Sequence, residues 1–313
     1  MKRFLIRILG VSLIPLPLGV LAVFMYFAEV KTYYRDLALP PDVTITASDD
    51  SIISLGVDPA YFPHFANRSA AGMGMAAGEV RLKDLAKRHP GQLKTVLLGL
   101  STTKFCMPRD GRIGNSERGK AFLWILHPEL RKTCPMREGE NVYSLFFQAE
   151  IPKRLRKFTQ SLFSRKKKFL SDAAGRFEPI DTCEFMENPA KVRDQLQEFL
   201  RLQCEVSGAQ KSCVLRQSAS FVRTAQSNGL EVVLVKMPVH KVLREGYRPE
   251  VLSSYHAACD QLRRQFNLRM LDYTEWNDSE AFWQNINHLN AHGAALFTKE
   301  LVRDFGKTAA ICR

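Results

Sequence analysis

Alternation between strand and helix patterns constrains the fold of this chain most strongly. The clearest strand pattern is Leu-Glu-Val-Val-Leu-Val-Lys-Met, from Leu230 to Met237, which Pro238 stops. Other strand patterns cover Val43 to Ala47, Leu93 to Leu100 and Met270 to Tyr273. Helical patterns cover residues 79–88, 191–203, 213–225 and 249–265, and a last helix follows Gly293 through Leu301. This order predicts an α/β fold with a mostly parallel sheet, helices on both faces, and active residues at the C-terminal ends of the strands.

An uncharged, largely apolar run of 21 residues, Ile8 to Ala28, lies near the N-terminus. At about 1.5 Å per residue it spans roughly 30 Å, the thickness of a bilayer core. Lys2, Arg3 and Arg7 precede it, which favours an orientation with the N-terminus inside. A cleaved signal peptide is the alternative, but the run is longer than a usual signal core and no small-x-small site directly follows it. We therefore expect a single-pass anchor in the cytoplasmic (inner) membrane.

This orientation predicts a cytoplasmic tip (residues 1–7), the anchor, a stalk (29–40), and a periplasmic or extracellular α/β domain (41–313). Disulfides form in such compartments, so the seven cysteines are informative. Cys204 and Cys213 are the best local pair. Further candidates are Cys106, Cys134 and Cys183. The odd count leaves at least one thiol free or paired with another chain, and the spacing leaves the connectivity open.

The region from about 106 to 190 fits the strand–helix rhythm poorly, and we expect it to be an insertion beside the sheet. Its segment from Lys153 to Lys168 holds eight Lys or Arg residues and no acid, and contributes much of the formal net charge of +13. Interleaved Leu and Phe residues make it a basic amphipathic helix, which suits an anionic membrane surface or a polyanionic envelope glycan. A solvated helix face is the plainer alternative. Nucleic acid is not an expected partner outside the cytoplasm.

A block near the C-terminus reads Asn285-Ile-Asn-His288-Leu-Asn290-Ala-His-Gly293-Ala. It resembles the last sequence block of the SGNH/GDSL hydrolase superfamily, Asp-x-x-His-Leu-Asn-x-x-Gly-Ala. In that family the His is the general base for a catalytic Ser, and the Asp three residues earlier orients it. Asn285 occupies that Asp position here.

The resemblance extends along the chain in the family's order. Asp49-Asp50-Ser51 follows the first strand, where the family has Gly-Asp-Ser with its nucleophile. The other similar blocks are Gly56 to Phe62, which is like a segment of a membrane-anchored bacterial subset, Asn67 to Gly72, Leu93 to Ser101, Val235 to Lys241 and Leu271 to Tyr273. Two features depart from the family: Asp49 replaces the Gly, and the Gly-x-Asn block is absent, since Leu100 and Ser101 follow Gly99.

The resemblance implies an SGNH-like three-layer fold and an esterase or an acyltransferase that acts on cell-envelope glycans. Such chemistry needs a Ser, a base that takes its proton, and a group that orients the base. Ser51, His288 and Asn285 match these three roles. Asn67, Gly72 and Ser101 match the neighbourhood of the oxyanion hole and the substrate. No cofactor is implied.

Asn285 leaves the activity open. It supplies no charge, and an amide N–H facing the ring would select the wrong tautomer of His288. Asp272 and Asp278 are alternative orienting groups. A catalytically degenerate protein that binds or scaffolds envelope components is therefore the second hypothesis. A basic adaptor at the membrane surface, for which the α/β domain is incidental, is the third.

Two other motifs do not support a cofactor or a metal. His288 and His292 have the spacing of a zinc pair, but Leu289 stands where the metalloprotease signature needs Glu. Gly114 to Ala121 has the phosphate-loop spacing, but Ala121 replaces the Ser or Thr that binds magnesium. We expect neither a metal nor a nucleotide.

Overall fold

The computed structural model of the chain describes residues 31, 33–35, 37–48, 51–69, 74–103, 181–203 and 208–309. No helix in this part of the chain is long and apolar enough to cross a bilayer. The predicted anchor, Ile8 to Ala28, lies outside the described residues, as do the basic segment Lys153 to Lys168 and residues 106–180 of the expected insertion.

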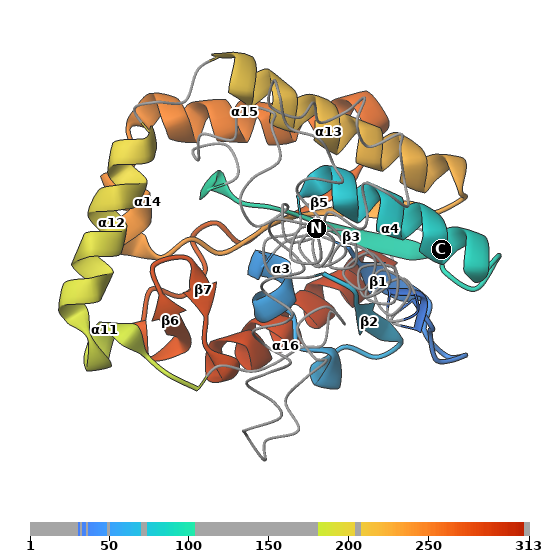
Figure 1. Cartoon of the computed structure of the whole chain (residues 1–313), viewed down its shortest axis with the longest axis horizontal. Coiled ribbons are helices and arrows are strands. Elements are labelled where there is room, and N and C mark those ends of the chain that lie inside the picture. The colour runs from blue at the N-terminus through green and yellow to red at the C-terminus, as the bar shows by residue number, and fades with distance from the viewer. Residues whose placement is uncertain are drawn as a thin grey trace, which may run out of the picture.

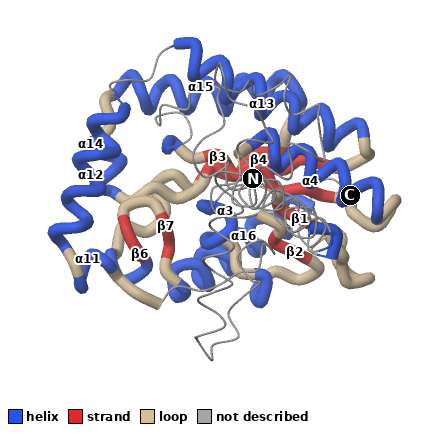
Figure 2. The backbone as a smooth tube through the Cα atoms, in the orientation of Figure 1, coloured by secondary structure: helices blue, strands red, loops and turns tan. Residues whose placement is uncertain are grey.

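The core of the fold is a sheet of five strands that are all parallel, in the order β2-β1-β3-β4-β5 (Figures 1 and 2). Its strands are β1 (Ile45–Ala47), β2 (Phe65–Asn67), β3 (Thr95–Leu100), β4 (Glu231–Lys236) and β5 (Arg269–Asp272). All six β3 residues are buried, because helices cover both faces of the sheet. The predicted α/β class with a parallel sheet is confirmed.

Helices pack on the two faces through separate apolar clusters. One face is covered by α4 (Met75–Arg88), α13 (Gly208–Ser227) and α15 (Pro249–Phe266). The other is covered by α3 (Ser51–Gly56) and α16 (Ala291–Ala309). Along β4, Val232 and Leu234 face the first group, whereas Val233 and Val235 face the second. This alternation gives three layers, with helices on either side of one sheet (Figure 1).

A third cluster lies beside the sheet. It joins α12 (Pro189–Gln203), α14 (Lys241–Gly246) and the antiparallel pair β6 (Trp283–Asn285) and β7 (His288–Leu289) through Val192, Leu243 and Ile286. The short helix α11 (Glu184–Glu187) packs on β6. The 3-10 turns η1 (Pro59–Tyr61) and η3 (Glu280–Phe282) both contact α16.

The described part of the predicted stalk packs on the domain instead of extending away from it. We call residues 31–43 the N-terminal strap. Tyr33 and Leu37 are buried in the cluster with α4, and the Tyr33 hydroxyl donates to Asp84 at 2.8 Å. Arg88 lies over the Tyr34 ring and donates to the Tyr34 carbonyl. The strap is therefore part of the folded domain.

Candidate functional site

The β6–β7 hairpin brings His288 and Asn285 together. The Nδ1 atom of His288 lies 3.2 Å from Oδ1 of Asn285. The same oxygen accepts hydrogen bonds from the backbone N–H groups of Asn287 at 3.1 Å and of His288 at 3.0 Å. Asn285 is buried and His288 is half-buried. The pair predicted from the sequence is thus in hydrogen-bond contact.

These bonds determine the tautomer of His288. Two backbone N–H groups can only donate, so the Asn285 atom that they share with the ring is the acceptor oxygen. Nδ1 of His288 must therefore carry a hydrogen, and Nε2 is the basic nitrogen of the neutral ring. The amide selects the tautomer that a general base requires. The concern that Asn285 presents an N–H to the ring is removed, although the residue still supplies no charge.

The hairpin is held in place by Asn290, which precedes α16. Its Nδ2 donates to the carbonyl of Ala281 at 2.8 Å, and its backbone N–H donates to the carbonyl of Phe282 at 3.1 Å. Its Oδ1 accepts from the N–H of Gly293 at 2.9 Å, which caps the first turn of α16. The helix therefore begins at Ala291. The sequence had predicted that it would begin after Gly293.

Ser51 is the first residue of α3, in the segment that follows β1. Its side chain lies outside the described part of the structure, as do Asp49 and Asp50. The helix packs against β7 and α16, and its Ile53 lies so close to Gly99 of β3 that a Cβ at position 99 would clash with it. The backbone of Ser51 and the strand that carries His288 thus belong to neighbouring elements at one edge of the sheet (Figure 1).

The three residues expected near the oxyanion hole have different environments. Both N–H bonds of the Asn67 amide are used within the fold, since Nδ2 donates to the carbonyls of Ile53 at 3.0 Å and Val57 at 2.9 Å. Asn67 therefore ties β2 to α3. Ser101 is buried just after β3, with its hydroxyl 2.7 Å from that of Thr103. Gly72 lies outside the described residues.

The two alternative orienting acids are engaged elsewhere. Asp278 pairs with Arg244, with contacts of 3.3 and 3.2 Å. Asp272 forms an ion pair with Lys236, and its other oxygen accepts from the backbone N–H and hydroxyl of Thr274. Partial burial opposes ionisation of Asp272, but the hydrogen bonds from Lys236 and Thr274 outweigh it and lower the pKa of the carboxyl. Asn285 is the group that orients His288.

The sequence analysis missed the cluster around Lys236. This lysine is buried at the end of β4, and its ammonium also lies 2.7 Å from Nδ1 of His256 and near the face of the Tyr255 ring. Burial, and then the charge of Lys236, lower the pKa of His256. A lysine that closes an apolar strand was the sequence feature that could have revealed this cluster.

His240 is another buried imidazole near the hairpin. Its Nδ1 accepts from the N–H of Val242 at 3.3 Å and caps α14, and its ring packs between Phe185 and Trp283. Burial lowers the pKa of His240, so the neutral ring is favoured. These contacts give His240 a structural role.

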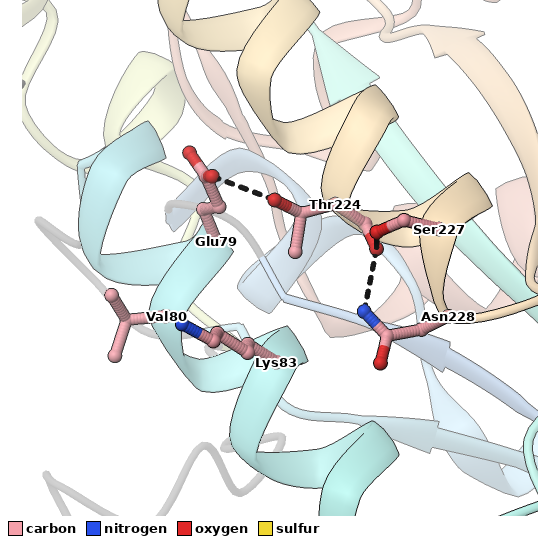
Figure 3. A pocket seen from close by; sticks show the side chains of 6 residues that line it. All are labelled: Glu79, Val80, Lys83, Thr224, Ser227 and Asn228. Atoms are coloured by element: carbon pink, nitrogen blue, oxygen red, sulfur yellow. Dashed lines mark hydrogen bonds between the residues drawn. The ribbon is translucent and has the colours of Figure 1, made fainter.

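A surface cavity of about 340 Å³ lies between α4 and α13, on the face of the sheet opposite α3. Figure 3 shows the residues that line it: Glu79, Val80, Lys83, Thr224, Ser227 and Asn228. The Glu79 carboxylate accepts hydrogen bonds from the hydroxyls of Thr224 at 2.7 Å and Ser220 at 2.9 Å. The cavity is separate from the His288 site.

The described residues include two cysteines whose side chains are placed. Cys183 and Cys259 are free cysteines, and the Cys183 thiol donates to the carbonyl of Glu280. The side chains of Cys204 and Cys213, the predicted local pair, lie outside the described residues, as do the further candidates Cys106 and Cys134. Within the described ranges, no group of three or more His, Cys, Asp or Glu residues could hold a metal ion.

Comparisons with known sequences add no family. No protein-family model and no curated protein matches this chain. The site itself and the resemblance of its motifs are therefore the basis for a function.

Proposed function

We propose that residues 41–313 form an SGNH-like domain that hydrolyses or transfers acyl esters on cell-envelope glycans, with Ser51 as the nucleophile and His288 as the general base. One observation carries the proposal: Oδ1 of Asn285 orients Nδ1 of His288, on a hairpin that packs against the helix begun by Ser51. The sequence resemblance supplies the reaction class.

In the first half-reaction the Ser51 hydroxyl oxygen attacks the ester carbonyl, and its proton passes to Nε2 of His288. Backbone N–H groups near Ser51 and Gly72 hold the oxyanion. Collapse of this intermediate breaks the ester bond, and the departing alcohol takes the proton from His288. In the second half-reaction His288 removes a proton from the acceptor, which attacks the acyl-Ser51. The bond between the acyl group and the Ser51 oxygen then breaks, and this oxygen takes the proton back from His288. Water as the acceptor gives an esterase, and a glycan hydroxyl gives a transferase.

Asn285 makes this a slow enzyme. It holds the correct tautomer, but it cannot stabilise the imidazolium that forms when His288 accepts the proton. An aspartate at position 285 would accept hydrogen bonds from the same two backbone N–H groups and would add the missing negative charge. Restoring this charge should therefore accelerate acylation of Ser51.

The location of the domain is part of the proposal. An anchor at Ile8 to Ala28, with the N-terminus inside, keeps the site close to envelope polymers. The basic segment Lys153 to Lys168 attracts anionic glycan or lipid.

Labelling of the purified full chain with a fluorophosphonate probe tests the proposal. We expect slow labelling of wild type at Ser51, none in Ser51→Ala or His288→Ala, and unchanged labelling in the matched variant Ser54→Ala, in the same helix. Asn285→Asp should label on the order of 10- to 100-fold faster. This gain is smaller than the about 10⁴-fold effect of the converse change in a serine protease, where the amide selects the wrong tautomer. Labelling that persists in Ser51→Ala would disprove the assignment of the nucleophile.

A binding or scaffold protein that keeps the fold is the second candidate. The neutral side chain at position 285 and the extra carboxylate of Asp49 beside the proposed nucleophile favour it. It predicts no labelling of wild type, with labelling that appears only in Asn285→Asp.

A further inference from the structure

The outer surface of α4 and α13 is strongly basic. We call the exposed cations of these two helices the basic layer: Lys83, Lys87 and Arg88 on α4, and Arg216 and Arg223 on α13. The two helices pack side by side on one face of the sheet (Figure 1). Over its twenty residues, α13 has no Asp or Glu.

Two carboxylates of α4 lie at this layer, and both are half-buried and hydrogen-bonded within the fold. Glu79 accepts from the hydroxyls of Ser220 and Thr224 on α13, and Asp84 accepts from the hydroxyl of Tyr33 on the strap. They connect α4 to its neighbours, while the cations remain exposed. The field of this surface is therefore positive.

The N-terminal strap fixes where the preceding chain reaches the domain. Tyr33 is buried against α4 between Asp84 and Arg81, whose guanidinium lies 6.0 Å from the Tyr33 ring centroid. Tyr33 is five residues from Ala28, the end of the apolar run. Fully extended, five residues span at most about 18 Å. If the run lies in a bilayer, the side of the domain that bears α4 is held within that distance of the hydrocarbon.

We propose that the basic layer docks on the anionic phospholipid headgroups of the membrane that holds Ile8 to Ala28. Each Lys or Arg near an anionic leaflet strengthens attachment, and the effect fades within a Debye length of about 8 Å at physiological salt. The short tether is long enough for the layer to reach that range and too short to carry it far from the membrane. A lipid surface fits better than a free glycan, because the strap places this surface next to the membrane whether or not a glycan is present. This proposal rests on the proposed anchor at Ile8 to Ala28, but not on acyl transfer.

An amine-reactivity footprint of the wild-type full chain in lipid nanodiscs tests this proposal. Discs that contain phosphatidylglycerol are compared with discs of phosphatidylcholine alone, and modified lysines are identified by mass spectrometry. We expect Lys83 and Lys87 to react several-fold more slowly in the anionic discs. Lys241 on α14 and Lys299 on α16 lie on other surfaces and should react equally in both. High salt should abolish the difference.

A matched pair of variants sharpens the test. Lys87→Gln combined with Arg216→Gln should remove the protection of Lys83, whereas Lys241→Gln combined with Lys299→Gln should leave it intact. Equal reactivity of Lys83 in the two kinds of disc would overturn the proposal, as would a full chain that does not enter the discs. Protection by a soluble polyanionic glycan, but not by anionic discs, would assign the layer to glycan instead.

Discussion

Asparagine amides hold α3 and the β6–β7 hairpin in place on one side of the sheet, whereas charged groups connect the elements on the side that carries α4 and α15. Asn67, Asn285 and Asn290 each bind backbone groups of a neighbouring segment on the first side. On the second, the Lys236 ammonium joins β4 to α15 and β5, and Asp84 joins α4 to the strap. The loops around His288 are thus held by amides that do not titrate, whereas the other side contains structural contacts that respond to pH and salt.

The largest effect should come from reversing the polarity of one amide. Asn67→Asp replaces an N–H donor with a carboxylate that faces the carbonyls of Ile53 and Val57. The backbone N–H of Ser69 still donates to the other oxygen of this side chain, but a buried charge that faces two carbonyl oxygens should lower the free energy of unfolding by about 3 to 5 kcal/mol. The matched change Asn285→Asp should alter the free energy of unfolding by less than about 1 kcal/mol, because Oδ1 of Asn285 only accepts hydrogen bonds. Urea denaturation of both variants measures the difference, and equal losses would contradict the assigned donor and acceptor roles.

A second change tests the close backbone approach on the same side. A methyl group at Gly293 would overlap the carbonyl oxygen of Phe282, and backbone cannot move as freely as a side chain. Gly293→Ala should destabilise the domain by about 2 to 4 kcal/mol and displace the hairpin that carries His288. Gly306→Ala is the control in the same helix, where a methyl group meets nothing within 4 Å. Gly306→Ala should stabilise the domain by up to about 1 kcal/mol. Thermal unfolding of Gly293→Ala and Gly306→Ala compares the stabilities of the two variants.

A smaller loss is expected where the strap meets α4. Burial and the neighbouring Asp84 raise the pKa of Tyr33, so its hydroxyl stays protonated and donates. Tyr33→Phe removes the donor and should cost about 1 to 2 kcal/mol, since the acceptor is charged. Tyr34→Phe keeps the ring under Arg88 and should change stability by less than about 0.5 kcal/mol. Equal effects in the two variants would show that the strap is held by its rings alone.

The sequence predicted those parts of the fold in which a long apolar period exists. The strands β1, β3, β4 and β5, and the helices α4, α12, α13, α15 and α16, were all expected, with ends that differ by a few residues. The strands β2, β6 and β7 were missed, because each has only two or three residues. The six-residue helix α3 was missed for the same reason. The strand β1 is equally short, but the alternating β-branched residues from Val43 to Ala47 revealed it.

The site was predicted by residue type, but the contacts within it needed coordinates. The His288–Asn285 pair followed from the motif, whereas the acceptor role of Asn285 depends on two N–H groups of the turn between β6 and β7. Similarly, Lys236 meets Asp272 because the register of β4 and β5 places these two residues opposite each other. Sequence spacing does not encode the register of strands far apart in the chain.

The smallest expected effect is a pH dependence that arises on the charged side of the sheet. The groups that act on His256 are Lys236 from β4, Asp272 at the end of β5, Asp260 on α15 and Glu275 in the loop after β5. Burial and Lys236 outweigh the three carboxylates, so the pKa of His256 in the folded state lies below its ordinary value of 6.5. The unfolded chain then binds more protons than the folded one as pH falls below about 6.5. The contribution of His256 to stability is therefore present above about pH 6.5, and it is lost as the pH falls through the lowered pKa of His256 in the folded state.

Urea midpoints measured from about pH 7.5 down to about pH 5, across the ordinary pKa of histidine, should accordingly decrease. His256→Gln keeps an acceptor for the Lys236 ammonium without a titrating ring, so its midpoints should change less with pH. His240, whose pKa is lowered in the same direction by burial, should contribute to the slope that remains in this variant. If the variant slope equals that of wild type, Nδ1 of His256 does not accept a hydrogen bond from the Lys236 ammonium. The ion pair between Lys236 and Asp272 would then hold the charged side alone.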